Sequence, residues 1–160
     1  MLNDISLPLG LHLRELQPQD QAFAETLFFS TRVFLYQMPL PKAQVDLLIK
    51  QQFILQQASY GASFPLAETF IIHLFAEPIG KLILNNTSDS LHLIDIAFLP
   101  SMRSRGYGSS ILRALKHLAD QARRPVRLAV DQQNTRAKKL YLNLGFALSE
   151  SSTTHDILLW

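Results

Sequence analysis

The chain of 160 residues contains no cysteine. This absence excludes a disulfide framework and a thiolate metal site, and it agrees with a reducing cytoplasm. Long apolar runs are also missing, because the longest, TFIIHLFAEPIGKLIL (69–84), is interrupted by charged residues and a proline. The first ten residues have neither a basic segment nor a long apolar run, so they do not resemble a signal peptide. We therefore expect a cytoplasmic protein without a membrane partner.

Charge of either sign is scarce overall but unevenly distributed. The formal net charge is +2, yet ten of the fifteen Lys and Arg residues lie between 103 and 139, where only two acids occur. The rest of the chain has five basic residues against eleven acidic ones. This pattern favours an anionic ligand near 103–139 and an amine-bearing one beside the acidic part. Nucleic acid is not expected, because the total charge is small and aromatic residues do not alternate with the basic ones. The five histidines show no pairing at helical spacing, so no metal is expected.

The hydrophobic periodicity predicts one mixed α/β (α+β) domain spanning residues 1–160. Strands are expected at 11–16, 68–75, 77–86, 91–100, 126–130, 146–151 and 155–160. Helices are expected at 17–34, 39–60, 111–122 and 134–144. Gly61 is expected to follow the second helix, and Glu77–Pro78 to form the turn between the second and third strands. The predicted order is β-α-α-β-β-β-α-β-α-β-β.

The segment RSRGYGSS (103–110) lies where the strand at 91–100 meets the third helix. Glycines at 106 and 108 allow positive φ and a close approach of the backbone to a ligand. The amides here and the helix N-terminus favour an anion, and two arginines and two serines add donors, which indicates a pyrophosphate site. The segment lacks the lysine of a Walker loop and the third glycine of a dinucleotide fingerprint. A simple strand–helix turn is the structural alternative.

Two motifs carry a resemblance to a known family. Arg103, Gly106 and Gly108 match the Q/R-x-x-G-x-G/A signature of the GCN5-related N-acetyltransferase (GNAT) superfamily. Downstream, NTRAKKLYLNLGF (134–146) resembles the N-x-x-A-x-x-L-Y-x-x-x-G-F stretch of that family. The resemblance implies a mixed, mostly antiparallel sheet of six to seven strands flanked by helices, with the fourth and fifth strands splayed. It covers the C-terminal half of the chain strongly and residues 17–68 only in outline.

The resemblance also implies acetyl-CoA as the acyl donor. Its pyrophosphate would lie on the amides of Arg103, Ser104, Arg105, Gly106, Tyr107, Gly108 and Ser109. Its pantetheine arm would pair like an added strand with Ile96, Ala97 and Phe98. Asn134 would hydrogen-bond the pantetheine or the neighbouring backbone, besides capping its helix.

Acetyl transfer to an amine needs a base for the ammonium proton and an acid for the departing thiolate. The family pattern assigns the acid to Tyr141, whose phenol stays protonated at neutral pH, and the thioester carbonyl to the amide of Phe98. His92 is the first candidate base, since strict alternation places it on one face with Ile94, Ile96 and Phe98. A bulge near Ile96 would change which side chains share a face and would favour Asp95 as the base. Glu68, His73 and a water relay are further alternatives.

The predicted function is transfer of an acetyl group from acetyl-CoA to a primary amine of a small molecule or peptide, by direct attack in a ternary complex. A non-catalytic acyl-CoA-binding regulatory module is the alternative, and a nucleotide-binding protein is a third reading. A homodimer is expected from the family. The acceptor site is expected among the aromatic residues of the first two helices and the following loop, with Tyr36 and Tyr60 at element ends.

Overall fold

The computed structural model describes residues 2, 5–8 and 10–160. Within these residues, one sheet of seven strands forms the centre of the molecule, in the order β1-β2-β3-β4-β5-β7-β6. Neighbouring strands are antiparallel except β4 and β5, which are parallel. The predicted mixed, mostly antiparallel sheet is therefore confirmed. Its strands are β1 (Leu11–Glu15), β2 (Glu68–Leu74), β3 (Glu77–Asn86), β4 (Leu91–Phe98), β5 (Val126–Asp131), β6 (Ala147–Ser151) and β7 (His155–Leu159).

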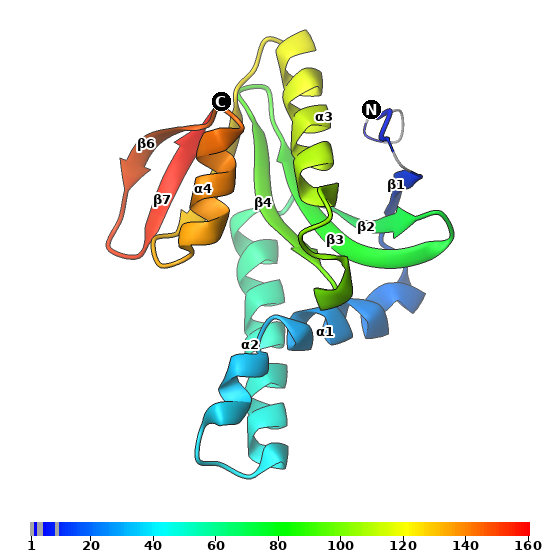
Figure 1. Ribbon diagram of the computed structural model, residues 1–160, viewed down its shortest axis with the longest axis vertical. Coiled ribbons are helices and arrows are strands. Elements are labelled where there is room, and N and C mark those ends of the chain that lie inside the picture. The colour runs from blue at the N-terminus through cyan, green and yellow to red at the C-terminus, as the bar shows by residue number, and fades with distance from the viewer. Residues whose placement is uncertain (1, 3–4, 9) are drawn as a thin grey trace.

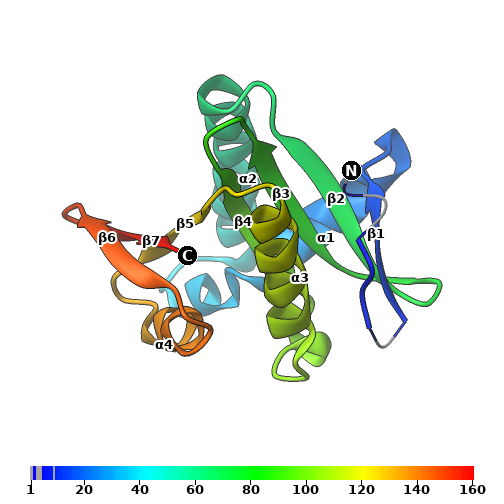
Figure 2. The same ribbon diagram turned by 90° about the horizontal axis from the view of Figure 1, so that it is seen from above.

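Helices cover both faces of the sheet (Figures 1 and 2). The α-helices are α1 (Gln21–Ser30), α2 (Lys42–Ser63), α3 (Tyr107–Gln121) and α4 (Thr135–Asn143). Short 3-10 turns are η2 (Pro18–Asp20), η3 (Val33–Gln37) and η4 (Pro100–Met102). Helices α3 and α4 lie on one face, and α1 and α2 lie on the other. Two apolar clusters follow from this layering, one joining α3 to the sheet and one joining α1 to α2.

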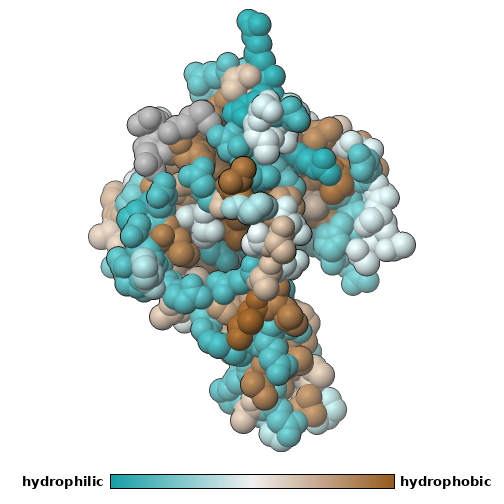
Figure 3. Space-filling view, turned by 180° about the vertical axis from the view of Figure 1, so that it is seen from behind, coloured by the Kyte–Doolittle hydropathy of each residue, from teal (hydrophilic) through white to brown (hydrophobic). Residues whose placement is uncertain are grey.

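The lower half of α2 and η3 project from the body of the molecule (Figure 1). Figure 3 shows apolar side chains exposed on this projection. Exposed apolar residues in η3 and the first half of α2 include Val33, Phe34 and Leu47, and Ile54 and Leu55 are exposed farther along α2. The predicted homodimer could use this surface. The homodimer stays a prediction, and size-exclusion chromatography would test it.

Several predicted element ends differ from the structure, among them the end of α2 and the turn between β2 and β3. Gly61 lies inside α2, which continues to Ser63. No side chain or backbone comes within 4 Å of a Cβ added at Gly61, so the helix passes this residue without a packing requirement. The turn between β2 and β3 falls at residues 75 and 76, where Phe75 adopts a φ of 53°. Glu77 and Pro78 instead pair with β2.

The parallel pairing of β4 with β5 is short. It joins Leu91–Leu93 to Val126–Leu128, and beyond these three positions the two strands diverge. The remainder of β4 therefore keeps an edge without a β5 partner. This is the splayed geometry that the resemblance implied.

A β-bulge in β4 changes which side chains share a face. Leu93 lies opposite Leu84 of β3, whereas Asp95 lies opposite the adjacent Ile83, so Ile94 is the extra residue. Side chains on directly opposed residues share a face, so the bulge places Asp95 on the face of His92. Ile96 and Phe98 lie on the other face and pack against the α3 cluster. The predicted grouping of His92 with Ile94, Ile96 and Phe98 is therefore wrong, because alternation is interrupted at Ile94.

Candidate active site

A cavity of about 490 Å³ opens where the end of β4, the first turn of α3 and α4 meet. We call it the donor cavity. It brings together eleven of the residues predicted to bind the donor: Ile96, Ala97, Phe98, Arg103, Ser104, Gly106, Tyr107, Gly108, Ser109, Asn134 and Tyr141. Arg105, the remaining predicted residue, does not line it. Thr31, Met102, Leu112, Arg136, Ala137 and Leu140 complete the lining.

The glycine-rich loop turns through two residues in the left-handed region. Ser104 has a φ of 61° and Gly106 a φ of 84°, and Gly106 directly precedes α3. The first amide bonded within the helix is that of Ser110, which donates to the Gly106 carbonyl at 3.0 Å. The amides of Tyr107, Gly108 and Ser109 precede it, and such helix-start amides are available to an anion.

Gly108 lies beside the end of β4. A Cβ at this position would lie 3.4 Å from Cε2 of Phe98, which is ordinary van der Waals contact. The first turn of α3 therefore packs next to the end of β4. The loop and the strand thus form one continuous wall of the donor cavity.

Two arginines border this wall in different ways. Arg103 donates from Nε to the Phe98 carbonyl at 3.1 Å, which ties the loop to the end of β4. Arg136, in the first turn of α4, donates to the hydroxyl of Ser104. Arg136 therefore belongs to the cavity, although the motif comparison did not single it out. The sequence feature that could have identified Arg136 is its position in the basic segment 103–139, two residues after Asn134.

Helix α4 carries Asn134 and Tyr141 into the donor cavity. Asn134 caps the helix by accepting a hydrogen bond from the Ala137 amide at 3.2 Å, as predicted. Tyr141 is half-buried and packs edge-on against Phe146, with ring centroids 6.0 Å apart. Burial raises the pKa of Tyr141, and the negative charge of Asp95 raises it further. The phenol is therefore protonated at neutral pH.

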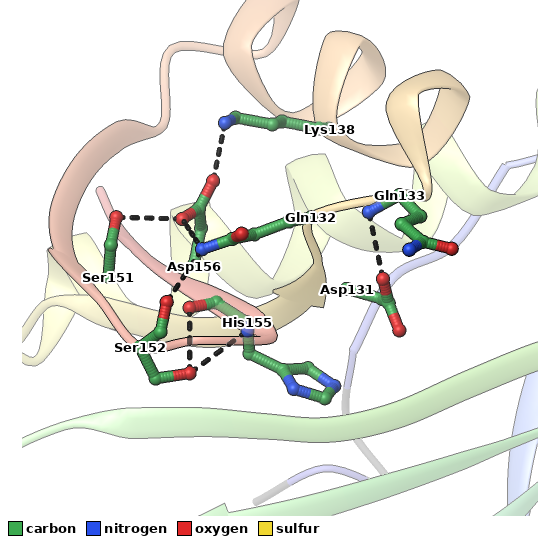
Figure 4. Close-up of polar contacts among 8 residues, drawn as sticks. All are labelled: Asp131, Gln132, Gln133, Lys138, Ser151, Ser152, His155 and Asp156. Carbon is green, nitrogen blue, oxygen red and sulfur yellow. Dashed lines mark hydrogen bonds and ion pairs between the residues drawn. The ribbon is translucent and has the colours of Figure 1, made fainter.

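A polar network holds α4 against the last two strands (Figure 4). Asp156 of β7 is 3% exposed and accepts hydrogen bonds from Lys138 of α4, from Ser151 of β6 at 2.7 Å and from Gln132 at 3.2 Å. Gln132 also donates to the Ser152 carbonyl at 2.8 Å. The Lys138 ammonium, followed by the Ser151 hydroxyl, lowers the pKa of Asp156. The network orients the helix from which Asn134 and Tyr141 project.

A second cavity, of about 130 Å³, lies between the end of α1 and the sheet. We call it the junction cavity, because it shares Thr31, Ile96 and Ala97 with the donor cavity. Its charged residues are Arg32, Lys81 and Asp95. Burial raises the pKa of Asp95, while Lys81 and Arg32 act in the opposite direction. The Asp95 side chain is 28% exposed and lines the junction cavity, whereas it does not line the donor cavity.

The alternative bases lie farther from the donor cavity. His92 sits where β4 still pairs with β5, and its ring stands edge-on to Phe64 at 5.1 Å. Burial lowers the pKa of His92, and the nearby Arg127 lowers it further. Glu68 is exposed at the start of β2, and His73 stacks on His12 at 4.9 Å near the opposite edge of the sheet. These three side chains do not line the donor or junction cavity, whereas Asp95 and Tyr141 share a third cavity of about 160 Å³.

The aromatic residues of the first two helices separate into core and cavity groups. Phe28 and Phe53 are buried together, with ring centroids 5.3 Å apart. Tyr60 and Phe64 line a cavity of about 240 Å³, which we call the aromatic cavity and which shares Gln56 and Lys81 with the junction cavity. Tyr36 bonds Asp46 on the surface and lines none of these cavities. Of the two tyrosines predicted to lie at the acceptor site, only Tyr60 lines one of these cavities.

Among residues 2, 5–8 and 10–160, no group of three metal-ligating side chains is found. The same residues contain no helix with the length and apolarity needed to cross a bilayer. These findings describe this part of the chain only.

Comparison with known proteins gives a consistent result. The sequence profile of the acetyltransferase (GNAT) family matches residues 33–146. No curated protein sequence matches the chain.

Several solved structures share the fold. PaiA N-acetyltransferase from Thermoplasma acidophilum, in complex with coenzyme A, has a TM-score of 0.67 at 16% identity and covers 93% of this chain and 97% of its own. Spermidine N-acetyltransferase from Vibrio cholerae, described as dodecameric, has a TM-score of 0.63 at 18% identity, covering 94% and 93%. Ribosomal-protein-S5-alanine acetyltransferase from Vibrio fischeri has a TM-score of 0.61 at 15% identity, covering 94% and 92%. Identities this low relate the folds alone.

Proposed function

The chain belongs to the acetyltransferase (GNAT) family, and we propose that it transfers the acetyl group of acetyl-CoA to a primary amine by direct attack in a ternary complex. The resemblance drawn from the two sequence motifs and the fold implied by it are both confirmed. The observation that carries the proposal is the donor cavity, which joins an anion-binding loop, an unpaired strand edge and a protonated tyrosine.

In the proposed donor complex, the pyrophosphate accepts hydrogen bonds from the loop amides and the first turn of α3. Arg103 and Arg136 add positive charge beside it, while Arg105 contributes through its backbone. The pantetheine arm follows Ile96–Phe98, where β4 has no β5 partner. An extended ligand with peptide-like amides satisfies such an edge as an added strand does. Asn134 contributes its side-chain amide at the same wall.

Transfer begins when the neutral amine attacks the thioester carbonyl carbon. The new C–N bond forms, the C–S bond breaks, and the amide of Phe98 stabilises the intermediate oxyanion. Tyr141 gives its phenolic proton to the departing thiolate, which leaves as the thiol. The phenolate left behind is the stronger base of the two groups, so it takes up the proton that the attacking nitrogen releases, and the phenol is restored.

Asp95 is the base that the geometry supports best. It lines the junction cavity beside Ile96 and Ala97, and its raised pKa brings a carboxyl closer to the value useful at neutral pH. His92 remains the second candidate, because a histidine has the more suitable ordinary pKa. A water molecule would have to relay the proton if His92 acts, since its ring does not line the donor or junction cavity.

The experiment that tests the proposal is an acceptor screen with acetyl-CoA and detection of the released thiol. Purified protein is expected to release CoA only when an amine acceptor is added, and mass spectrometry is expected to find the acetylated amine. Calorimetry with acetyl-CoA is run in parallel. Binding without turnover of any amine would support the non-catalytic acyl-CoA-binding module instead.

A further inference from the structure

The junction cavity contains two cations and one carboxylate. The guanidinium of Arg32 lies 4.6 Å from the centroid of the Phe28 ring and donates to the Thr31 hydroxyl at 3.0 Å. In the part of the chain that the structure describes, no carboxylate forms an ion pair with Arg32. Most of its donors are therefore available to a ligand in the cavity.

Lys81 is nearly enclosed, with its side chain 7% exposed. Its Nζ lies 3.9 Å from Oδ2 of Asp95, which exceeds the length of a charge-assisted hydrogen bond. A buried ammonium held at this distance is poorly compensated. A second anion at the cavity would complete its hydrogen bonding.

The acidic residues of the N-terminal half do not offset these cations. Three of them are paired with basic side chains outside the cavity: Asp20 with Arg14 at 2.8 Å, Asp46 with Lys42 at 3.0 Å and Glu25 with Lys50 at 2.6 Å. Asp95 is the one carboxylate among the residues that line the junction and aromatic cavities. The junction cavity itself carries two cations beside one carboxylate, so an acceptor that also bears an anion fits it better than one with ammonium groups alone.

The aromatic cavity supplies a different environment beside the cations. Its polar lining residues are Gln56, Gln57, Thr69 and Lys81, and the others are Leu16, Ala24, Tyr60, Gly61, Phe64, Pro65, Ala67 and Ile83. Burial raises the pKa of Tyr60 to about 12, so its hydroxyl remains neutral. An uncharged, apolar group fits this lining better than a second ammonium.

Taking acetyl transfer as the proposed function, we infer that the acceptor is an α-amino acid with an apolar side chain. Its carboxylate binds Arg32 and Lys81, its amine faces Asp95 and the donor cavity, and its side chain enters the aromatic cavity. Two cations at a short distance from the amine position attract a carboxylate carried on the same small molecule. The same cations repel a polyamine, which would bring two or more ammonium groups into the cavity.

The test compares leucine, leucinamide and spermidine as acceptors with acetyl-CoA, measuring kcat/KM by thiol release. We expect leucine to be the preferred acceptor. Arg32→Gln is expected to lower kcat/KM for leucine by about tenfold or more, the effect of losing a hydrogen bond between charged groups. The same variant should leave leucinamide nearly unchanged, so the ratio between the two acceptors falls. The ratio is compared because it cancels any general loss of activity.

Arg113→Gln is the matched control, since Arg113 is exposed on α3 and lines none of the cavities. Lys81→Gln provides a second variant, with circular dichroism to verify folding. Acetylation of spermidine or leucinamide as fast as leucine would overturn the inference and leave the proposed function intact, as would an equal effect of Arg32→Gln on both leucine and leucinamide. Turnover of no amine at all would overturn both.

Discussion

Tyr141 is half-buried and lines the donor cavity. Burial keeps its phenol protonated, and its position suits a proton donor to the sulfur of the proposed CoA thiolate. Tyr141→Phe keeps the ring that packs against Phe146 and removes only the hydroxyl. We expect kcat to fall by about 100-fold, which is typical of losing a general acid. The dissociation constant for CoA, measured by calorimetry, should stay the same.

Tyr36→Phe is the control for this substitution, because Tyr36 is bonded to Asp46 away from the cavities. Its turnover should equal that of the unmodified protein. Unchanged turnover in Tyr141→Phe would exclude this residue as the acid.

Asp95 and His92 share a face of β4, and their pKa values move in opposite directions. A base acts when deprotonated, so activity falls as pH decreases through its pKa. Burial raises the pKa of Asp95, so the acidic limb of its profile should lie above that of an ordinary carboxyl. Burial lowers the pKa of His92, so a limb due to His92 should lie below that of an ordinary histidine.

We expect Asp95→Asn to lower kcat/KM by about 100-fold and to remove this limb, measured between acidic and neutral pH. His92→Gln should retain both the rate and the limb. The reverse result, with the limb lost only in His92→Gln, would assign the base to His92 acting through water.

At the scale of the element, the orientation of α4 depends on the Asp156 network. The folded-state pKa of Asp156 is lowered, chiefly by the Lys138 ammonium. Its stabilising contribution is therefore fully present above the unfolded-state pKa and is lost as pH falls through the lower folded-state pKa. Asp156→Asn should reduce the thermal midpoint at neutral pH, and the difference should shrink below about pH 4, where the unfolded carboxyl protonates.

Thermal unfolding at several pH values measures this effect. Asp46→Asn is the control, because its ion pair with Lys42 is exposed on α2 and such pairs contribute little. A difference between Asp156→Asn and the unmodified protein that is independent of pH would contradict the ionic role.

The sheet as an element was largely predictable, but the positions where it departs from regularity were not. Alternation and turn residues indicated every strand, and Asn134 and Gly145 correctly marked the ends of α4. The bulge at Ile94 has no equivalent signal, because a residue inserted into one strand is defined by its partner strand. Residue-by-residue alternation therefore placed Ile96 and Phe98 on the wrong face relative to His92.

At the scale of the whole molecule, the donor cavity lies where β4 and β5 separate, and these two strands have the fewest paired residues of any neighbours in the sheet. Only three residue pairs connect β4 to β5 in the described chain, and these two strands link the two parts of the sheet. A donor that contacts β4, α3 and α4 together binds the folded state alone. CoA at one hundred times its dissociation constant should therefore raise the free energy of unfolding by about 2.7 kcal/mol.

Chemical denaturation with and without ligand measures this stabilisation, and ATP serves as the comparison. ATP is expected to stabilise less, because it lacks a pantetheine arm to pair with β4. Equal stabilisation by both at the same concentration would instead support the nucleotide-binding reading.

The amino-acid sequence by itself determined most of the elements, the position of the glycine-rich loop and the family, because these depend on periodicity and on residues close together along the chain. It also located Asn134 and Tyr141 through their spacing on one helix. Only the tertiary structure brought Arg32, Lys81 and Asp95 into one cavity, since they come from segments far apart in sequence. It also paired three acids of the N-terminal half with basic residues, so these acids do not lie beside the charged residues of the junction cavity. Net charge is a sum over residues, whereas the field at a site depends on which charges the fold places beside it.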